Sequence, residues 1–244
     1  MGGKMREKII GILGGMGPEA TIDLFSKIVK ETKAKKDQDH LRILIDNNPK
    51  IPDRTLALQG KGPSPLPQLA RSARALEKAG ADFIAIPCVT AHNYHEALQK
   101  RLRIPVLHIV EETLKTINTR LKGIHRIGLI ATTGTIETGL FQKFFYPADL
   151  ELLIPTSRIQ REWVMKAIYG KEGIKSIGPS EPSRYLIHKV SQELIRHGAE
   201  AIIAGCTEVP LVLRDGDLPV PVIDVLSVLA KAAVEKSRSR KRRS

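Results

Sequence analysis

The sequence predicts an α/β protein of two pseudo-symmetric domains, each a three-layer arrangement of helices around a parallel sheet. Two observations lead to this fold class. Short apolar runs without polar alternation indicate strands buried on both faces, and the amphipathic segments between them indicate covering helices. The same order of segments then occurs twice along the chain, which indicates an internal duplication.

The duplication is seen in three blocks that return in the same order in the second half. The offsets from Gly11 to Gly128, from Cys88 to Cys206 and from Val106 to Val222 are 117, 118 and 116 residues. A period this long indicates duplicated domains, because solenoid repeats have periods of roughly 20–50 residues. We expect an N-terminal domain over 1–115 that is completed by 219–236, a C-terminal domain over 116–218, and a disordered basic tail over 237–244.

In the first half, turn residues separate the expected elements. Pro18, in the sequence GGMGPEA, favours the first turn of a helix, where its missing N–H would be unpaired in any case. Two prolines in residues 47–55 force a loop. The expected strands are 8–13, 41–45, 83–86 and 105–109, and the expected helices follow Pro18, span 67–79 and lead from 109 to about 120.

The second half repeats this rhythm. Its expected strands are 126–131, 151–154 and 201–204, and its expected helices are 136–145, 159–169 and 180–197. A final strand and helix over 219–236 match the block at 103–115. We therefore expect the chain to cross back at its end, so that the two domains pack together.

The net charge of +13 is concentrated at the C-terminus, where the last nine residues, KSRSRKRRS, carry six positive charges and no acid. This tail either contacts the phosphates of nucleic acid or a membrane surface, or it is solvated without a role. The remaining charge of +7 suits an anionic substrate. Aromatic residues make up only 4% of the chain, which argues against base stacking and so against nucleic acid as the main partner.

Cysteine content and hydropathy indicate a cytoplasmic protein. Two cysteines in 244 residues do not suggest a secreted disulfide scaffold, so we expect reduced thiols. No apolar stretch approaches the roughly 18 residues that span a bilayer, and no signal peptide is recognised. We therefore expect no membrane association through a spanning segment.

The two cysteines occupy matching positions, Cys88 in GADFIAIPCVTAH and Cys206 in GAEAIIAGCTEVP. Each follows a predicted strand and precedes a predicted helix, and ligands of open α/β sheets bind at the carboxyl ends of strands. A helix N-terminus lowers the pKa of a thiol, so both are candidates for thiolate chemistry. The alternative for each cysteine is a small buried apolar residue.

The motifs around these residues resemble the aspartate/glutamate racemase family. They are GILGGMGPEAT (11–21), NNPKIPDRT (47–55), IPCVTAH (86–92) and GCTEVP (205–210), and they span nearly the whole chain in order. Glutamate racemases usually open with a D-S-G type loop and carry GCTH. Here the loop reads GGMG and the second motif ends in Glu208, so the chain is most similar to the aspartate racemase branch.

The resemblance implies racemisation of aspartate, or of glutamate, without a cofactor and in a homodimer. One cysteine is the thiolate base and the other is the thiol acid, because inverting a stereocentre without oxidation needs a base and an acid on opposite faces. The carbanion is expected to be stabilised by backbone N–H groups after each cysteine and by the hydroxyls of Thr90 and Thr207. Met16, Val89 and Glu208 are further expected substrate contacts.

By the same resemblance, Arg54 and Lys175 hold the substrate carboxylates. A planar guanidinium meets a carboxylate bidentately, which suits Arg54 to this role. The alternatives are that Arg54 ties down its own loop and that Lys175 is a solvated charge. The GGMG loop either offers N–H groups to an anion or is only a structural turn.

One residue departs from the family pattern, because Val89 stands where PCNTAH has asparagine. The loss of the amide makes this side of the pocket apolar. Restoring asparagine is then expected to improve aspartate turnover, unless Val89 adapts the site to a less polar substrate.

Two alternative functions remain open: a cysteine-dependent isomerase or decarboxylase of another small acid, and a non-catalytic binding protein on the same scaffold. We expect no metal site, because His92, His95 and Glu96 do not match the H-E-x-x-H zinc pattern.

Overall fold

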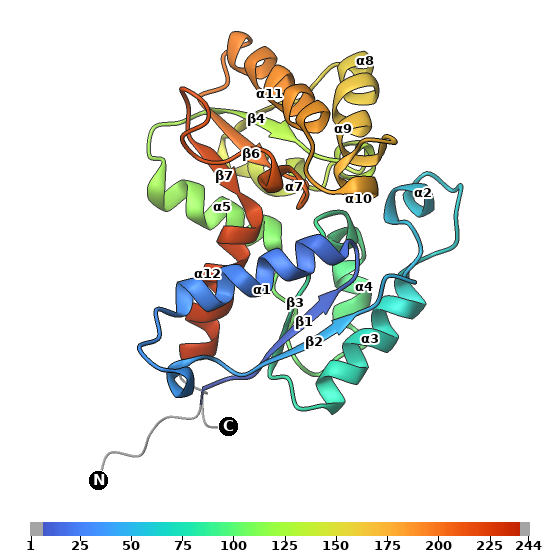
Figure 1. Cartoon of the computed structure of the whole chain (residues 1–244), viewed down its shortest axis with the longest axis vertical. Coiled ribbons are helices and arrows are strands. Elements are labelled where there is room, and N and C mark those ends of the chain that lie inside the picture. Colours follow the sequence, from blue (N-terminus) through green and yellow to red (C-terminus); the bar gives the residue numbers. More distant parts are fainter. Residues whose placement is uncertain (1–6, 240–244) are drawn as a thin grey trace.

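The computed structural model describes residues 7–239 and confirms the predicted α/β class (Figure 1). The chain forms two lobes, each built on a parallel sheet. The N-terminal lobe has three strands in the order β2 (Ile43–Asn47), β1 (Ile10–Gly14) and β3 (Phe83–Ala85). The C-terminal lobe has four strands in the order β5 (Glu151–Leu153), β4 (Arg126–Ile130), β6 (Ala201–Ala204) and β7 (Val222–Asp224).

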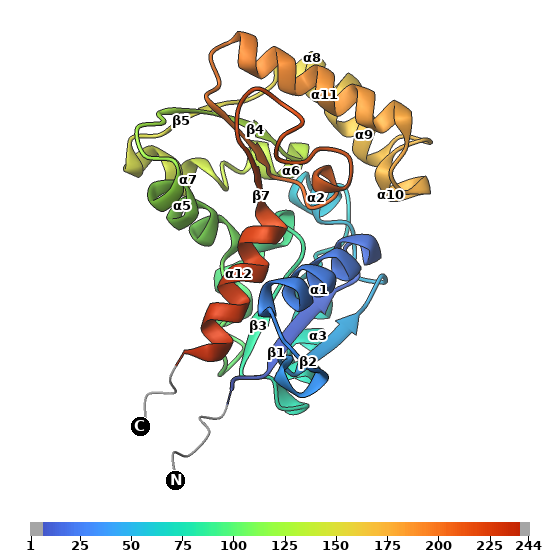
Figure 2. The ribbon, with the colours of Figure 1, turned by 60° about the vertical axis from the view of Figure 1, so that its left-hand side comes forward.

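Helices cover both faces of each sheet, as Figures 1 and 2 show. The longer ones are α1 (Pro18–Thr32), α3 (Leu66–Lys78), α5 (Ile109–Arg120), α11 (Glu181–Arg196) and α12 (Val225–Arg238). The shorter ones are α2 (Arg54–Leu58), α4 (His95–Gln99), α6 (Thr133–Glu137), α7 (Gln142–Phe145), α8 (Ser157–Ile159), α9 (Lys166–Tyr169) and α10 (Ile174–Ile177). Single 3-10 turns span Asp37–Asp39, Thr90–Tyr94, Tyr146–Ala148 and Val209–Leu211.

Local sequence accounts for most of these boundaries. Pro18 is the first residue of α1, and Ser180 caps α11 in a reciprocal pair with Ser183. The helix expected over 136–145 is instead divided into α6 and α7, because Gly139 between them adopts a φ of +65°. The helix expected over 159–169 begins at Ser157 and contains a π-helical segment, Gln160–Met165, between α8 and α9.

The duplication extends to strand pairing. β1 pairs with β2 and β3 in the same parallel manner as β4 pairs with β5 and β6. The fourth strand of the C-terminal lobe, β7, pairs with β6. Its counterpart in the N-terminal lobe is reduced to a single parallel bridge between Ile84 and Val106. The two sheets are therefore copies that differ at one edge.

The segment 219–236 does not simply complete the N-terminal domain, as the repeat had suggested. Its strand β7 belongs to the C-terminal sheet, where Ile202 pairs with Val222. Its helix α12 then crosses to the other lobe and packs against α1 and α5 (Figure 2). α12 packs there because its apolar side chains Val225, Leu226 and Leu229 are buried against a surface that the N-terminal lobe provides.

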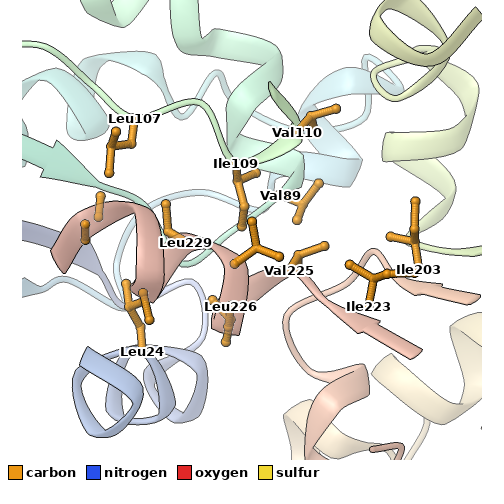
Figure 3. Packing of buried hydrophobic residues seen from close by; sticks show 14 of the residues in the cluster. Leu24, Val89, Leu107, Ile109, Val110, Ile203, Ile223, Val225, Leu226 and Leu229 are labelled. Atoms are coloured by element: carbon orange, nitrogen blue, oxygen red, sulfur yellow. The ribbon is translucent and has the colours of Figure 1, made fainter. Parts of the chain in front are cut away.

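One apolar core runs through both lobes (Figure 3). It joins Leu24 of α1 and Ile109 of α5 to Val225 of α12 and Ile203 of β6, and all four side chains are fully buried. Val89 packs in the same cluster. Separating the lobes would expose this core to water, so their relative position is held by apolar burial.

The predicted start of the basic tail was wrong. Ser237 and Arg238 continue α12, and Ser237 is fully buried. The Ser237 hydroxyl donates to the Lys8 carbonyl at 2.6 Å, and the Lys8 N–H donates to the Ser237 carbonyl at 2.9 Å. These bonds tie the helix end to the chain start. The rest of the predicted tail, from residue 240, lies outside the described residues.

No helix between residues 7 and 239 combines the length and the apolar character that crossing a bilayer requires.

Three histidine rings gather beside the junction of the lobes. His92 and His95 follow β3, His108 caps α5, and the His108 ring lies 4.7 Å from the ring of Phe144 in the C-terminal lobe. The pKa of His92 is lowered to about 4 and that of His108 to about 3, in both cases mainly by burial and further by the neighbouring histidines. Both rings are therefore neutral in the folded protein at neutral pH.

We predict that this cluster makes the protein less stable in acid. The pKa of His108 is lower in the folded protein than in the unfolded chain, so its contribution is complete above about pH 6.5 and is lost as pH falls towards 3. His108→Asn keeps a capping side chain on α5 but cannot titrate. Thermal unfolding between about pH 7 and 4 should therefore show a smaller decrease in Tm for this variant than for the wild type.

The exposed residue His197, changed to asparagine, is the matched control and should keep the wild-type slope. Equal slopes for the wild type and His108→Asn would contradict this account of the cluster.

Candidate functional site

The loops that follow β1, β3, β4 and β6 meet in one small cavity between the lobes. Because the strands of each sheet are parallel, their carboxyl ends converge on one side, and here the two sheets present these ends to each other. The cavity is lined by Met16, Arg54, Cys88, Val89, Thr90, Thr132, Tyr169, Lys175, Cys206, Thr207 and Glu208.

All nine residues singled out from the sequence lie in this lining. Two further residues, Thr132 and Tyr169, were not foreseen. Thr132 follows β4 at the repeat offset from Gly15, so the duplication carried a signal for it. Tyr169 ends a helix in a segment without a recognisable motif, and no sequence signal pointed to it.

The two cysteines are the reactive groups of the cavity. Each is only 5% exposed, and both are free thiols. Cys88 lies three residues after β3 and Cys206 two residues after β6. The Cys206 thiol donates to Glu208 Oε2 at 2.9 Å.

The structure corrects one expectation about the thiols. A helix N-terminus was expected to lower the pKa of both, but burial, together with the negative charge of Glu208, raises the pKa of Cys206 well above its ordinary value. The helix that follows is only a 3-10 turn, Val209–Leu211, whose dipole is small. Cys206 is therefore a protonated thiol at neutral pH.

Glu208 and Lys175 form an ion pair at the edge of the cavity. The Lys175 ammonium also donates to the Met16 carbonyl of the other lobe at 3.3 Å. Burial alone would lower the pKa of Lys175, but Glu208 and the two cysteines raise it above its ordinary value. The side chain is thus a fixed cation rather than a solvated charge.

Arg54 is buried and makes contacts that fit both roles considered for it. Its guanidinium donates to the carbonyls of Ile51, Pro52 and Met16 at 3.0–3.3 Å, which ties down the loop before α2. Its Nε–H is buried and has no acceptor within residues 7–239. Burial opposes its charge, yet the neighbouring Cys88, Tyr169 and Asp53 raise the pKa of Arg54. One donor therefore remains for a bound carboxylate.

The GGMG loop offers a carbonyl to the two cations of the cavity. The Met16 carbonyl accepts from both Arg54 and Lys175, so it holds the two cations together. The Gly15 N–H is occupied by the Thr21 hydroxyl at 2.9 Å. Gly15 itself is required, because its φ is +93° and a Cβ would lie 2.3 Å from the backbone of Asn48.

The hydroxyls of the cavity are engaged with one another or with Glu208. Thr90 bonds Thr132 at 2.9 Å and Thr135 at 3.0 Å, which links the loop after β3 to α6 of the other lobe. Thr207 donates to Glu208 Oε2 at 3.3 Å. The side chain of Val89 reaches the cavity but also packs in the shared core with Ile109 and Val110 (Figure 3).

The cavity is closed in this structure. Its free volume is about 10 Å³, which is the space of roughly one water molecule. Tyr169 forms part of the wall, and its hydroxyl donates to Asp53 Oδ2 at 3.4 Å. Burial and the Asp53 charge raise the pKa of Tyr169, so this hydroxyl stays protonated. A molecule larger than water can enter only after some part of the lining moves.

The histidines next to the cavity form hydrogen bonds with backbone carbonyls. His92 Nδ1 lies 2.9 Å from the Cys88 carbonyl, and His95 Nε2 lies 3.0 Å from the Val106 carbonyl. No group of three histidine, cysteine or carboxylate side chains in residues 7–239 is arranged to hold a metal ion. His92 thus positions the loop that carries Cys88.

Two thiols that face one closed cavity, one of them protonated, can take up and deliver a proton. The neighbouring groups add two cations and one carboxylate. Because the charges of Lys175 and Glu208 cancel, the lining of the cavity has a net charge of about one positive unit, from Arg54. The arrangement therefore suits acid–base chemistry on a small anion.

Comparisons with known proteins agree with this geometry. Residues 13–233 match the family model of the Asp/Glu/Hydantoin racemases. The chain is 32% identical over 232 residues to the "Broad specificity amino-acid racemase RacX" of Bacillus subtilis, covering 93% of this chain and 96% of the relative.

Solved structures give the same result. The fold superposes on the aspartate racemase of Picrophilus torridus with a TM-score of 0.82 at 27% identity, over 96% of both chains. It superposes on a glutamate racemase of Francisella tularensis with a TM-score of 0.65 at 17% identity, over 94% of this chain and 80% of that one, which shows a shared fold. The chain therefore belongs to the Asp/Glu/hydantoin racemase family.

Proposed function

We propose that this protein is an amino-acid racemase that inverts the α-carbon by proton transfer between Cys88 and Cys206, without a cofactor. The observation that carries the proposal is the placement of one thiol from each half of the duplication in the same cavity. The family membership and the similarity to racemases over the full length support it.

The two thiols differ in their surroundings, which suggests a starting state. Cys206 is held as a thiol by burial and by Glu208, so it is the acid. Cys88 lies beside the guanidinium of Arg54, so it is the candidate base. In one direction the Cys88 thiolate takes the α-proton, the C–H electron pair passes into the α-carboxylate, and the Cys206 S–H gives its proton to the opposite face.

The reaction leaves the protonation states exchanged. Cys206 is then the thiolate, next to the Lys175 cation, and Cys88 is the thiol. This state is ready for the opposite enantiomer, as reversibility requires. The free Nε–H of Arg54 is suited to hold the α-carboxylate on which negative charge develops.

The substrate predicted from the resemblance is aspartate, with glutamate second. The charges of the cavity support the α-carboxylate directly, whereas a second carboxylate would compete with Glu208 for Lys175. The first experiment is therefore to incubate both enantiomers of acidic, neutral and basic amino acids in deuterated water and to follow inversion by chiral chromatography.

We predict that Cys88→Ala and Cys206→Ala each abolish racemisation, with kcat/KM lowered by about a hundred- to ten-thousandfold. The physical reason is that inversion needs both a proton acceptor and a proton donor. With one thiol left, deuterium exchange into one enantiomer should survive while inversion does not. Chiral chromatography and the NMR signal of the α-proton measure the two events separately.

Ser191→Ala removes a buried hydroxyl far from the cavity and serves as the matched control. A single-cysteine variant that racemises at the wild-type rate would rule out the two-thiol mechanism.

A second prediction concerns the partners of Cys206. Glu208→Gln removes the charge that raises the pKa of the Cys206 thiol, so this pKa should decrease. Lys175→Met removes a cation that lowers the same pKa, so it should increase. The titration can be followed in a Cys88→Ser background by the ultraviolet absorbance of the thiolate.

In the intact enzyme the same changes should shift the alkaline limb of the pH profile of kcat/KM. The limb should move to lower pH in Glu208→Gln and to higher pH in Lys175→Met, when the reaction is measured in the direction in which Cys206 donates the proton. Glu112→Gln, which breaks a distant ion pair with Lys115, is the control and should move neither curve. Shifts of the same sign in the two test variants would contradict the assigned electrostatics.

A third prediction concerns Val89. Because its side chain packs in the shared apolar core, Val89→Asn should lower the unfolding free energy by about 1–3 kcal/mol through burial of an unpaired amide. Because the amide would then lie in the core, we expect no gain in aspartate turnover, in contrast to the expectation from the family pattern. Denaturant unfolding and kcat/KM for aspartate test both points, with Val89→Ala as the variant that loses volume without adding a polar group.

An asparagine variant as stable as the wild type and faster on aspartate would show instead that an amide belongs at this position.

A further inference from the structure

A second, much larger cavity adjoins the cysteines. Its volume is about 600 Å³, which lies in the range of small-molecule sites, whereas the cysteine cavity offers about 10 Å³. It lies between α2 of the N-terminal lobe and α6, the Ile154–Ser157 loop and the π-helical segment of the C-terminal lobe. Tyr169 lines both cavities and so forms part of the wall between them.

The walls of this side cavity are mainly apolar. Leu56, Ile136, Ile154 and Met165 line it. Leu56 is 47% exposed and Ile154 is 44% exposed, although they lie on different lobes and face the same space. Exposed apolar side chains that converge on a cavity are typical of a ligand site and are unfavourable if nothing covers them.

Two buried polar groups in the lining lack partners. Gln160 is 6% exposed and its Nε2 donates to the Ala131 carbonyl, but its Oε1 has no donor within the described residues. Thr55 is 5% exposed, and its hydroxyl likewise has no partner within residues 7–239. Both oxygens are also almost inaccessible from the cavity, so they do not by themselves identify a ligand in it.

The charged residues of the lining favour a ligand with a positive charge. Asp53 and Glu137 both line the side cavity, and Glu137 accepts from Gln59 at 3.2 Å. Arg161 is a lining cation, and it is paired with Glu162 at 3.6 Å. An acidic side chain would meet two carboxylates here, whereas a cationic one would meet acceptors.

The shared core favours opening of the cysteine cavity at its rim, where Tyr169 also borders the side cavity. The lobes cannot separate without exposing apolar surface, so the cysteine cavity has to open at its rim. The long contact between Tyr169 and Asp53, at 3.4 Å, is part of that rim and is weaker than an ideal hydrogen bond. Turning Tyr169 away would join the two cavities without disturbing the core.

We propose that the side cavity binds the side chain of the substrate, and that the preferred substrates are amino acids with a long apolar stem and a cationic end, such as lysine. This inference rests on the proposed racemase function. The α-carbon lies between the thiols, the stem passes Tyr169 along the apolar walls, and the terminal ammonium reaches the carboxylates of Asp53 and Glu137.

The test uses the full chain with both enantiomers of lysine, norleucine, alanine and aspartate. Norleucine shares the apolar stem of lysine without its charge. We expect kcat/KM to be highest for lysine, lower for norleucine and lowest for aspartate. Aspartate turned over faster than lysine would overturn the inference while leaving the racemase function intact.

Two variants locate the effect. Ile136→Trp fills the cavity and should lower the lysine-to-alanine ratio of kcat/KM by roughly tenfold, the cost of losing good contact for one long side chain. Glu137→Gln should lower the lysine-to-norleucine ratio by about threefold to fivefold, as expected for one solvent-exposed charge pair. Ile22→Trp and Glu151→Gln are the matched exposed controls outside the cavity, and their ratios should stay at the wild-type value.

Calorimetric titration with lysine separates the two proposals. If lysine binds to the wild type and binds more weakly to Glu137→Gln, the side cavity is supported. This holds even if no amino acid is racemised, because the lack of racemisation would overturn only the proposed function. Unchanged ratios in both cavity variants, or no lysine binding beside measurable alanine racemisation, would overturn the inference.

Discussion

The ion pair between Lys175 and Glu208 is the contact on which the site depends. Glu208 keeps the Cys206 thiol protonated, and Lys175 reaches across to the Met16 carbonyl of the other lobe. A buried pair of this kind pays a large desolvation cost, and its value lies in orientation more than in stability. Here Glu208 accepts from the Cys206 thiol, Lys175 bridges the two lobes at the Met16 carbonyl, and Arg54 is a cavity cation outside this ion pair.

The shared apolar core and the polar cavity place opposite demands on motion. The core joins α1, α5, α12 and β6 and resists separation of the lobes. In the proposed mechanism the cavity would open for each substrate and close again, because desolvation would strengthen the electrostatic contacts around the carbanion. These demands are compatible if movement is confined to the rim, where Tyr169 and the loop of Asp53 meet through a single long hydrogen bond.

Much of the fold and of the cavity was readable from sequence, because the duplication repeats both the strands and the cysteines. The offset of 118 residues placed Cys88 and Cys206 at equivalent strand ends, and the structure puts both in one cavity. The repeat assigned the whole segment 219–236 to the N-terminal domain, whereas only α12 packs against the N-terminal lobe and β7 pairs with β6 of the C-terminal sheet. Tyr169 was missed because its position depends on how a π-helical segment turns the helix before it. The charge state of Cys206 was also misjudged, because burial outweighs the small dipole of a 3-10 turn.

The departure from symmetry is as informative as the symmetry itself. Two residues after each cysteine the halves differ, with Thr90 in the first and Glu208 in the second. Thr90 is bound up with the hydroxyls of Thr132 and Thr135 and carries no charge, whereas Glu208 contacts the cysteine of its own half. A strictly symmetric site would give both thiols the same proton affinity, and neither would begin as the base. In the mechanism that we propose, the duplication would supply the two opposed thiols, and Glu208, together with burial, would make Cys206 the one that starts with the proton.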